Sequence, residues 1–406
     1  MKIALDNIAQ ILRKITGLLE ELEEAYFTAR QSALALFVNL GNLLAGLSIS
    51  SALEQLRTHP WVFRIYPQVL GTRGILTGIF SARTSTGLHL GSINSSLRRN
   101  TRYFYSLVST MLVLASLSAL MIYILFSIST LYISVDIYTV VYTTIAAVSP
   151  FSLFFISFIA FQVFRKKLDP DILLYPSSSV LNDVIISLVF VGVVRAIILQ
   201  ATTFLLALTV VFMALFSALG FYIFYYGQKD VFLTTLKEGG LALFIGLSIE
   251  LGTGIVLNEL LKAGGIAKIA ILYPVMLSVL GSSTSIIGSM LTTRISTGEF
   301  DFSISSLKRF SQNILGLQAA SVTFHGALSI IASILVEDFS CLEFFALSYL
   351  SHILGFIVMI PVVFLTAYIT YRKGLDPDNF INPIQSSIAD LVETISILVV
   401  AKSILR

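Results

Sequence analysis

The sequence predicts an all-α integral membrane protein made of two parallel five-helix repeats with one linker transmembrane helix between them, about 11 spans in all. The first observation is composition: of 406 residues, 56% are hydrophobic and only 12% are charged, where soluble domains carry about 25% charged residues. The second is a series of apolar segments long enough to cross a bilayer. The third is a set of motifs that recur in the same order in both halves of the chain.

Eleven segments reach the roughly 20 apolar residues that a spanning helix needs. They cover residues 32–56, 66–86, 104–130, 138–164, 177–199, 203–227, 239–262, 266–292, 312–336, 342–370 and 384–404. Only a short turn near Gln200 separates the fifth segment from the sixth. Residues 1–30 differ from these, because charges interrupt their helically spaced leucines and isoleucines. They predict an amphipathic helix that lies on the membrane surface or against a partner.

Basic residues gather in alternate loops, and this pattern predicts the orientation of the chain. Clusters fall around Arg98, Arg165, Lys229, Lys308 and Arg372. The positive-inside rule therefore predicts a multi-pass protein of the cell membrane with a cytoplasmic N-terminus. A minority of basic residues, in the loops after the first and seventh segments, oppose this assignment.

An internal repeat organises the chain. The sequence Leu-Asp-Pro-Asp at 168–171 returns at 375–378, so that Asp376 follows Asp169 by 207 residues (376 minus 169). The same offset relates Tyr66 to Tyr273, Pro176 to Pro383, Ser179 to Ser386 and Asp183 to Asp390. The expected division is a first repeat at 31–200, a linker helix at 201–230 and a second repeat at 231–406. Five spans would invert the second copy, but the linker helix restores its direction, so the repeats share an axis along the membrane normal.

Two aspartates inside predicted spans are the leading candidates for a functional site. An ionised side chain at the centre of a span costs about 2.5–3.5 kcal/mol, so it calls for a reason. Ser179 and Ser187 lie four residues on either side of Asp183 and share its helix face. The second copy repeats this stripe as Ser386, Asp390 and Thr394.

Parallel repeats bring the two stripes to the common axis, where two carboxylates flanked by hydroxyls form an oxygen-only environment. Hard divalent cations prefer such ligands, and Mg²⁺ usually keeps several of its waters. The alternative is structural: each aspartate caps a helix or bonds a neighbouring backbone group.

Glutamates provide a second tier of candidates. Glu54 and Glu259 both lie near the outer end of the first helix of a repeat, where they either collect cations at the extracellular mouth or are simply solvated. Glu250 and Glu393 lack an acidic residue at the matching position of the first repeat. We therefore rank them below the two aspartates.

The remaining motifs exclude several classes of function. The chain has no phosphate-binding loop with its lysine, no HExxH, no GxSxG and no dinucleotide fingerprint, which predicts a protein that is not an enzyme and needs no cofactor. A net charge of +3 without a long basic run argues against a nucleic-acid partner. The single cysteine, Cys341, excludes an internal disulfide. The four histidines show no ligand-like spacing.

The repeated motifs resemble a known family. The pattern Asp-Pro-x5-Pro-x6-Asp at 169–183 and 376–390 is similar to the last transmembrane helix of MgtE-type magnesium channels. The Gly/Ser-rich segments that end in Arg-x-Ser-Thr-Gly at 83–87 and 294–298 resemble the second helix of that family and of its double-repeat relatives, solute carrier family 41. The resemblance covers residues 40–404.

This resemblance implies a divalent-cation path on the two-fold axis, Mg²⁺ as the default substrate, and Asp183 and Asp390 as its pore-lining aspartates. One fused chain then stands in for the bacterial homodimer. The sequence departs from the family where Arg73 stands in the second helix and the Gly-Gly-Asn of bacterial members is missing. Two alternatives stay open: a Na⁺- or H⁺-coupled divalent cation exchanger, and a non-transporting membrane scaffold subunit.

Overall fold

A computed structural model describes residues 22–30, 32–52, 59–166, 170–262, 266–296, 298–335, 340–373 and 377–404. Most of the residues in these ranges are helical, and no strand occurs in them. Most of the amphipathic helix expected over residues 1–30 lies outside the described residues. The all-α fold class predicted from the sequence is confirmed.

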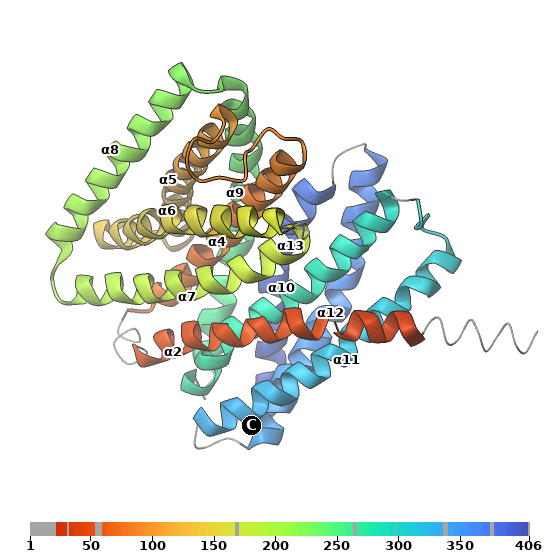
Figure 1. Cartoon of the computed structure of the whole chain (residues 1–406). Helices are drawn as coiled ribbons and strands as arrows, with labels where there is room; N and C mark the ends of the chain where they lie inside the picture. Colours follow the sequence, from red (N-terminus) through yellow and green to blue (C-terminus); the bar gives the residue numbers. More distant parts are fainter. Residues whose placement is uncertain are drawn as a thin grey trace, which may run out of the picture.

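The helices follow the predicted spans (Figure 1). The first repeat begins with the helix Leu22–Ser51, which contains a 3-10 turn, η1 (Asn39–Asn42), followed by α2 (Leu43–Ser51). It continues with α4 (Trp61–His89), α5 (Arg102–Thr130), α6 (Val135–Arg165) and α7 (Pro170–Ile198). The linker helix is α8 (Thr202–Tyr226). The second repeat comprises α9 (Lys229–Lys262), α10 (Ile266–Ser296), α11 (Ile304–Leu335), α12 (Cys341–Arg372) and α13 (Pro377–Ile404).

Within the described ranges, nine helices are both long enough and apolar enough to cross a membrane. The other two segments predicted as spans correspond to α4 and α13, which are long enough at 29 and 28 residues but are more polar. Their polarity has a structural reason. Both helices lie inside the bundle and contribute side chains to an internal cavity, so they need less apolar surface than a helix that faces lipid.

Local sequence signals set several helix ends. Both α7 and α13 begin at a proline, Pro170 and Pro377, seven residues before the predicted starts at 177 and 384. Proline fits the first helical position because the amide hydrogen that it lacks has no partner there. Ser340 and Glu343 form a capping box at the start of α12. Gln200 adopts a left-handed conformation with φ 62°, which confirms the short turn predicted between α7 and α8.

The two repeats are interleaved through their first helices. α2 of the first repeat packs against α10 of the second, and α9 of the second packs against α4 of the first. Glycines permit both crossings: a Cβ atom on Gly46 would lie 1.9 Å from the backbone oxygen of Ile271, and one on Gly254 would lie 2.1 Å from that of Arg64. Small residues of this kind allow close packing of membrane helices.

Two ion pairs connect the same helices. Arg83 of α4 pairs with Glu238 of α9 at 2.6 Å, and Arg294 of α10 pairs with Glu24 of the first helix. These arginines begin the two Arg-x-Ser-Thr-Gly motifs, so the repeat seen in the sequence is also a repeat of contacts. Each pair joins the second helix of one repeat to the first helix of the other.

The linker helix α8 lies at the edge of the molecule, away from the region where α4, α10 and α13 meet (Figure 1). Its large apolar side chains, such as Phe204, Val210 and Phe221, are exposed, as expected of a helix that faces lipid. With α8 between two sets of five, corresponding helices run in the same direction, which agrees with parallel repeats.

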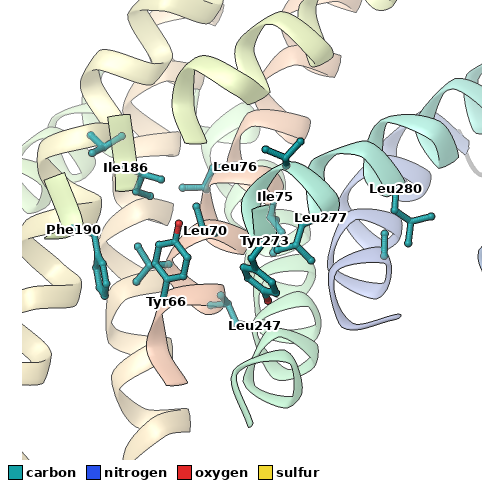
Figure 2. Packing of buried hydrophobic residues seen from close by; sticks show 14 of the residues in the cluster. Tyr66, Leu70, Ile75, Leu76, Ile186, Phe190, Leu247, Tyr273, Leu277 and Leu280 are labelled. Atoms are coloured by element: carbon teal, nitrogen blue, oxygen red, sulfur yellow. The ribbon is translucent and has the colours of Figure 1, made fainter. Parts of the chain in front are cut away.

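Two buried tyrosines mark the centre of the bundle (Figure 2). The hydroxyl of Tyr66 lies 2.9 Å from that of Ser187, and the hydroxyl of Tyr273 lies 2.9 Å from that of Thr394. Each pair joins the second helix of a repeat to its fifth helix. The sequence offset of 207 therefore holds for side-chain contacts in the core.

Candidate functional site

A cavity lies where the second and fifth helices of both repeats meet. Its lining includes Leu70, Gly71, Arg73, Gly74, Ser179 and Asp183 from the first repeat, and Pro274, Leu277, Ser278, Gly281, Ser282, Ser386 and Asp390 from the second. Its volume is about 40 Å³, above the roughly 10–15 Å³ that one water molecule requires. The structure thus brings both predicted aspartates to one internal space.

Asp183 on α7 is buried and already has a cationic partner. The Arg73 guanidinium, from α4, forms a salt bridge with one carboxylate oxygen of Asp183. Arg73 also donates a hydrogen bond to the Ser179 hydroxyl at 2.8 Å, and the Asn42 amide donates to the second carboxylate oxygen of Asp183 at 3.2 Å. The carboxylate of the first repeat is therefore neutralised by a residue of the protein itself.

Asp390 on α13 has different neighbours. Leu280 stands at the position equivalent to Arg73 (280 minus 73 is 207), so the second repeat brings no arginine of its own to this aspartate. The carboxyl group of Glu250 on α9 lies beside Asp390 instead. Glu250 can approach because Gly71 has no side chain: a Cβ atom there would lie 2.6 Å from a carboxylate oxygen of Glu250.

Asn42 and Glu250 occupy equivalent places, although they are 208 residues apart (250 minus 42) rather than 207. Gly46 and Gly254, which make the equivalent close approaches described above, show the same offset (254 minus 46). The offset returns to 207 at Tyr66 and Tyr273, so the first repeat has one residue more between its first and second helices (66 minus 46 is 20, whereas 273 minus 254 is 19).

The hydroxyl residues on either side of the two aspartates have two different roles. Ser179 and Ser386 line the cavity next to the aspartates. Ser187 and Thr394 do not line the cavity. The hydroxyl of each lies next to that of a buried tyrosine. Each hydroxyl also donates a hydrogen bond, 2.6 Å long in both repeats, to the backbone oxygen of the aspartate four residues earlier. They fix the orientation of their helices.

Of the two predicted glutamates at the outer ends of the first helices, Glu259 is described by the structure and lies away from the cavity. Glu259 is exposed and lies nine residues beyond Glu250 on α9, about 13 Å along the helix axis at 1.5 Å per residue. It does not line the cavity. Glu54 lies outside the described residues, so the proposed pairing of Glu54 with Glu259 stays a prediction.

The arrangement suits a cation held mainly through oxygen atoms and water. Among the residues that the structure describes, no group of three or more His, Cys, Asp and Glu side chains is arranged to hold a metal ion. A cation in the cavity would therefore meet carboxylates in pairs, with serine hydroxyls and its own waters completing the shell. Mg²⁺ binds proteins in this way, through one or two carboxylates.

The structure also joins residues that the sequence did not connect. Glu250 lies beside Asp390, and Arg73 meets Asp183. A third pair lies apart from the cavity: the rings of His325 on α11 and His352 on α12 are buried with their centroids 5.0 Å apart. Their wide and irregular spacing in the sequence gave no signal of this contact.

Comparison with known proteins identifies the repeated unit. The MgtE family model, described as a divalent cation transporter, matches residues 66–193 and again residues 273–400. Both ends of the two matches differ by the same offset of 207 (273 minus 66, and 400 minus 193). No curated protein and no solved structure matches the chain.

Proposed function

Because the chain belongs to the MgtE family of divalent cation transporters, we propose that it carries Mg²⁺ across the cell membrane through the cavity lined by Asp183 and Asp390. One observation carries the proposal. Aspartates from equivalent positions of the two repeats reach the same internal cavity, each with a serine hydroxyl beside it. A path between two parallel repeats follows their common axis.

The ligand chemistry supports Mg²⁺ as the substrate. The polar groups that line the cavity are carboxylates, hydroxyls and one guanidinium, and neither thiols nor imidazoles are among them. Oxygen ligands favour hard cations, whereas softer transition metals favour nitrogen and sulfur. The cavity also leaves room for water, and Mg²⁺ gives up its waters reluctantly.

The same proposal sets the organisation of the chain. Residues 31–200 form one repeat, residues 201–230 the linker and residues 231–406 the other repeat, so that a single chain supplies both walls of the path. The basic loops support a cytoplasmic N-terminus. Transport then requires the bilayer and the cation, with no cofactor and no nucleic acid.

Flux through the purified protein in proteoliposomes tests the proposal. We expect uptake of Mg²⁺ that exceeds uptake of Mn²⁺, Co²⁺, Ca²⁺ and Na⁺, and that falls sharply in Asp390→Asn. Repeating the assay with imposed Na⁺ and proton gradients separates passive flux from coupled exchange. Absence of flux for every divalent cation, with no metal-dependent stabilisation of the protein, would refute transport and favour a scaffold role.

A further inference from the structure

The two repeats present unequal charges to the shared cavity. On the first side Asp183 is paired with Arg73 and bonded by Asn42, so the group is neutral overall. On the second side Asp390 lies beside Glu250, and the arginine is replaced by Leu280. The sides differ at two equivalent positions, and both differences make the second side more negative.

We propose that Glu250 and Asp390 together form the cation-contacting pair of the cavity, and that the Arg73 guanidinium serves as a built-in cation that satisfies Asp183. This inference rests on the proposed function and deepens it, since it assigns the transported ion to one side of the cavity. When both carboxylates are ionised they carry a charge of −2, which one divalent cation balances. On the other side, one arginine balances one aspartate.

The surroundings of Glu250 point to a missing partner. Its side chain is fully buried, and its polar neighbours are Asp390 and the hydroxyl groups of Thr253 and Ser387, with no basic side chain among them. Neither carboxylate oxygen has a partner at ordinary hydrogen-bond geometry. The group lies over Gly71, a residue of the cavity wall, next to Asp390. A buried carboxylate without a positively charged partner is unfavourable, and repulsion from Asp390 adds to that cost. A cation between the two carboxylates removes both penalties.

In the first repeat, by contrast, both oxygens of the equivalent aspartate, Asp183, have partners within the protein. At the position of Glu250 stands Asn42, a neutral residue whose amide donates to Asp183. The other oxygen of Asp183 is taken by Arg73, which also bonds Ser179. A metal ion would have to displace a buried guanidinium to reach Asp183. Arg73 also acts on Asp390 through its charge, but no ion pair to Asp390 occurs in the described part of the chain.

Glu393 is the remaining acidic group near Asp390. It is fully buried, and one of its carboxylate oxygens lies 2.7 Å from the place where a Cβ atom on Gly355 of α12 would be. It therefore faces α12 and is absent from the cavity wall. We assign it no part in the cation pair.

The first experiment measures stabilisation of the purified full chain by MgCl₂ and MnCl₂ in detergent. Glu250→Gln should weaken the apparent affinity for both ions by at least tenfold, because losing even an outer partner of a metal ligand commonly costs about 10–100-fold. Glu238→Gln, an exposed glutamate on the same helix, is the matched control and should keep wild-type affinity. Unfolding without metal reports whether each variant is folded, and Glu250→Asn, which copies Asn42, serves as a second variant.

The second experiment tests the arginine. Asp183→Asn alone leaves the Arg73 charge uncompensated beside the cavity, so cation affinity should fall. The double variant Arg73→Leu with Asp183→Asn removes one charge of each sign and should return affinity to within about threefold of wild type, a difference below the 1.4 kcal/mol that corresponds to tenfold. Arg73→Leu alone should bind Mg²⁺ more tightly than wild type.

The outcomes separate this inference from the proposed function. If Asp390→Asn loses the metal response while Glu250→Gln and Glu250→Asn keep it, the cavity binds cations but Glu250 is not a ligand. If the double variant binds as poorly as Asp183→Asn, then Asp183 contacts the cation directly and the role given to Arg73 is wrong. If all of these variants, including Asp390→Asn, respond to Mg²⁺ like wild type, the cavity itself is not the cation site.

Discussion

The crossing of α4 and α9 depends on Gly254, and Gly254→Ala tests it. The added Cβ atom would lie 2.1 Å from the backbone oxygen of Arg64, whereas carbon and oxygen atoms in close helix contacts stay about 3.3 Å apart. The shortfall is about 1.2 Å. The obstacle is backbone rather than a flexible side chain, so the two helices have to separate.

Overpacking of this kind costs about 1–3 kcal/mol, and the better helix propensity of alanine offsets at most about 1 kcal/mol. We therefore expect Gly254→Ala to lose about 1–2 kcal/mol of stability. For chains of 150–250 residues, 1 kcal/mol shifts Tm by about 2–4 °C, so the expected fall in this larger chain is a few degrees. Gly46→Ala should behave alike, because its Cβ atom would lie 1.9 Å from the backbone oxygen of Ile271.

The assay is thermal unfolding in detergent, followed by circular dichroism at one fixed scan rate because such unfolding is often irreversible. Gly240→Ala is the matched control on α9, since no atom lies within 4 Å of the added Cβ. It should keep or slightly raise Tm. A Gly254→Ala protein as stable as Gly240→Ala would show that the two helices do not cross as closely as described.

Two further predictions concern the site and the topology. The double variant Asp183→Asn with Asp390→Asn should lose little Mg²⁺-dependent stabilisation beyond Asp390→Asn alone, because loss of Asp390 already removes the cation site that the change at Asp183 would weaken; full additivity would argue for two independent sites. Cysteines introduced at Arg98 and Lys308, in a Cys341→Ser background, should both react with an impermeant reagent from the same side of the membrane, because the repeats are parallel. Labelling from opposite sides would contradict the parallel arrangement.

The sequence predicted most of the architecture because its signals are local or periodic. Apolar length located the helices, and the offset of 207 located Asp183 and Asp390 together with the tyrosines that orient their helices. The same offset concealed Glu250. The first repeat has one residue more between Gly46 and Tyr66 than the second has between Gly254 and Tyr273, so a fixed offset pairs Glu250 with Leu43 rather than with Asn42. A difference of one residue leaves no trace in hydropathy, and the equivalent close approaches of Gly46 and Gly254 reveal it.

The partner of Arg73 was equally hidden. An arginine in the second helix stood out as a departure from the family, but its meeting with Asp183 depends on how α4 and α7 pack. The sequence alone does not reveal tertiary contacts of this kind. The position of Glu259 shows the converse: an acidic residue near the outer end of a first helix does not by itself indicate proximity to the cavity.

The covalent fusion of the two repeats has an evolutionary consequence. In a symmetric homodimer every mutation appears twice, so an arginine gained beside one aspartate is also gained beside the other. Two guanidiniums facing each other across the cavity would repel an incoming cation and each other. A single gene that encodes both halves escapes this constraint, because each half accumulates changes independently. Arg73 and Glu250, each present in only one half, are changes that an ancestor with identical subunits could not have tested one at a time.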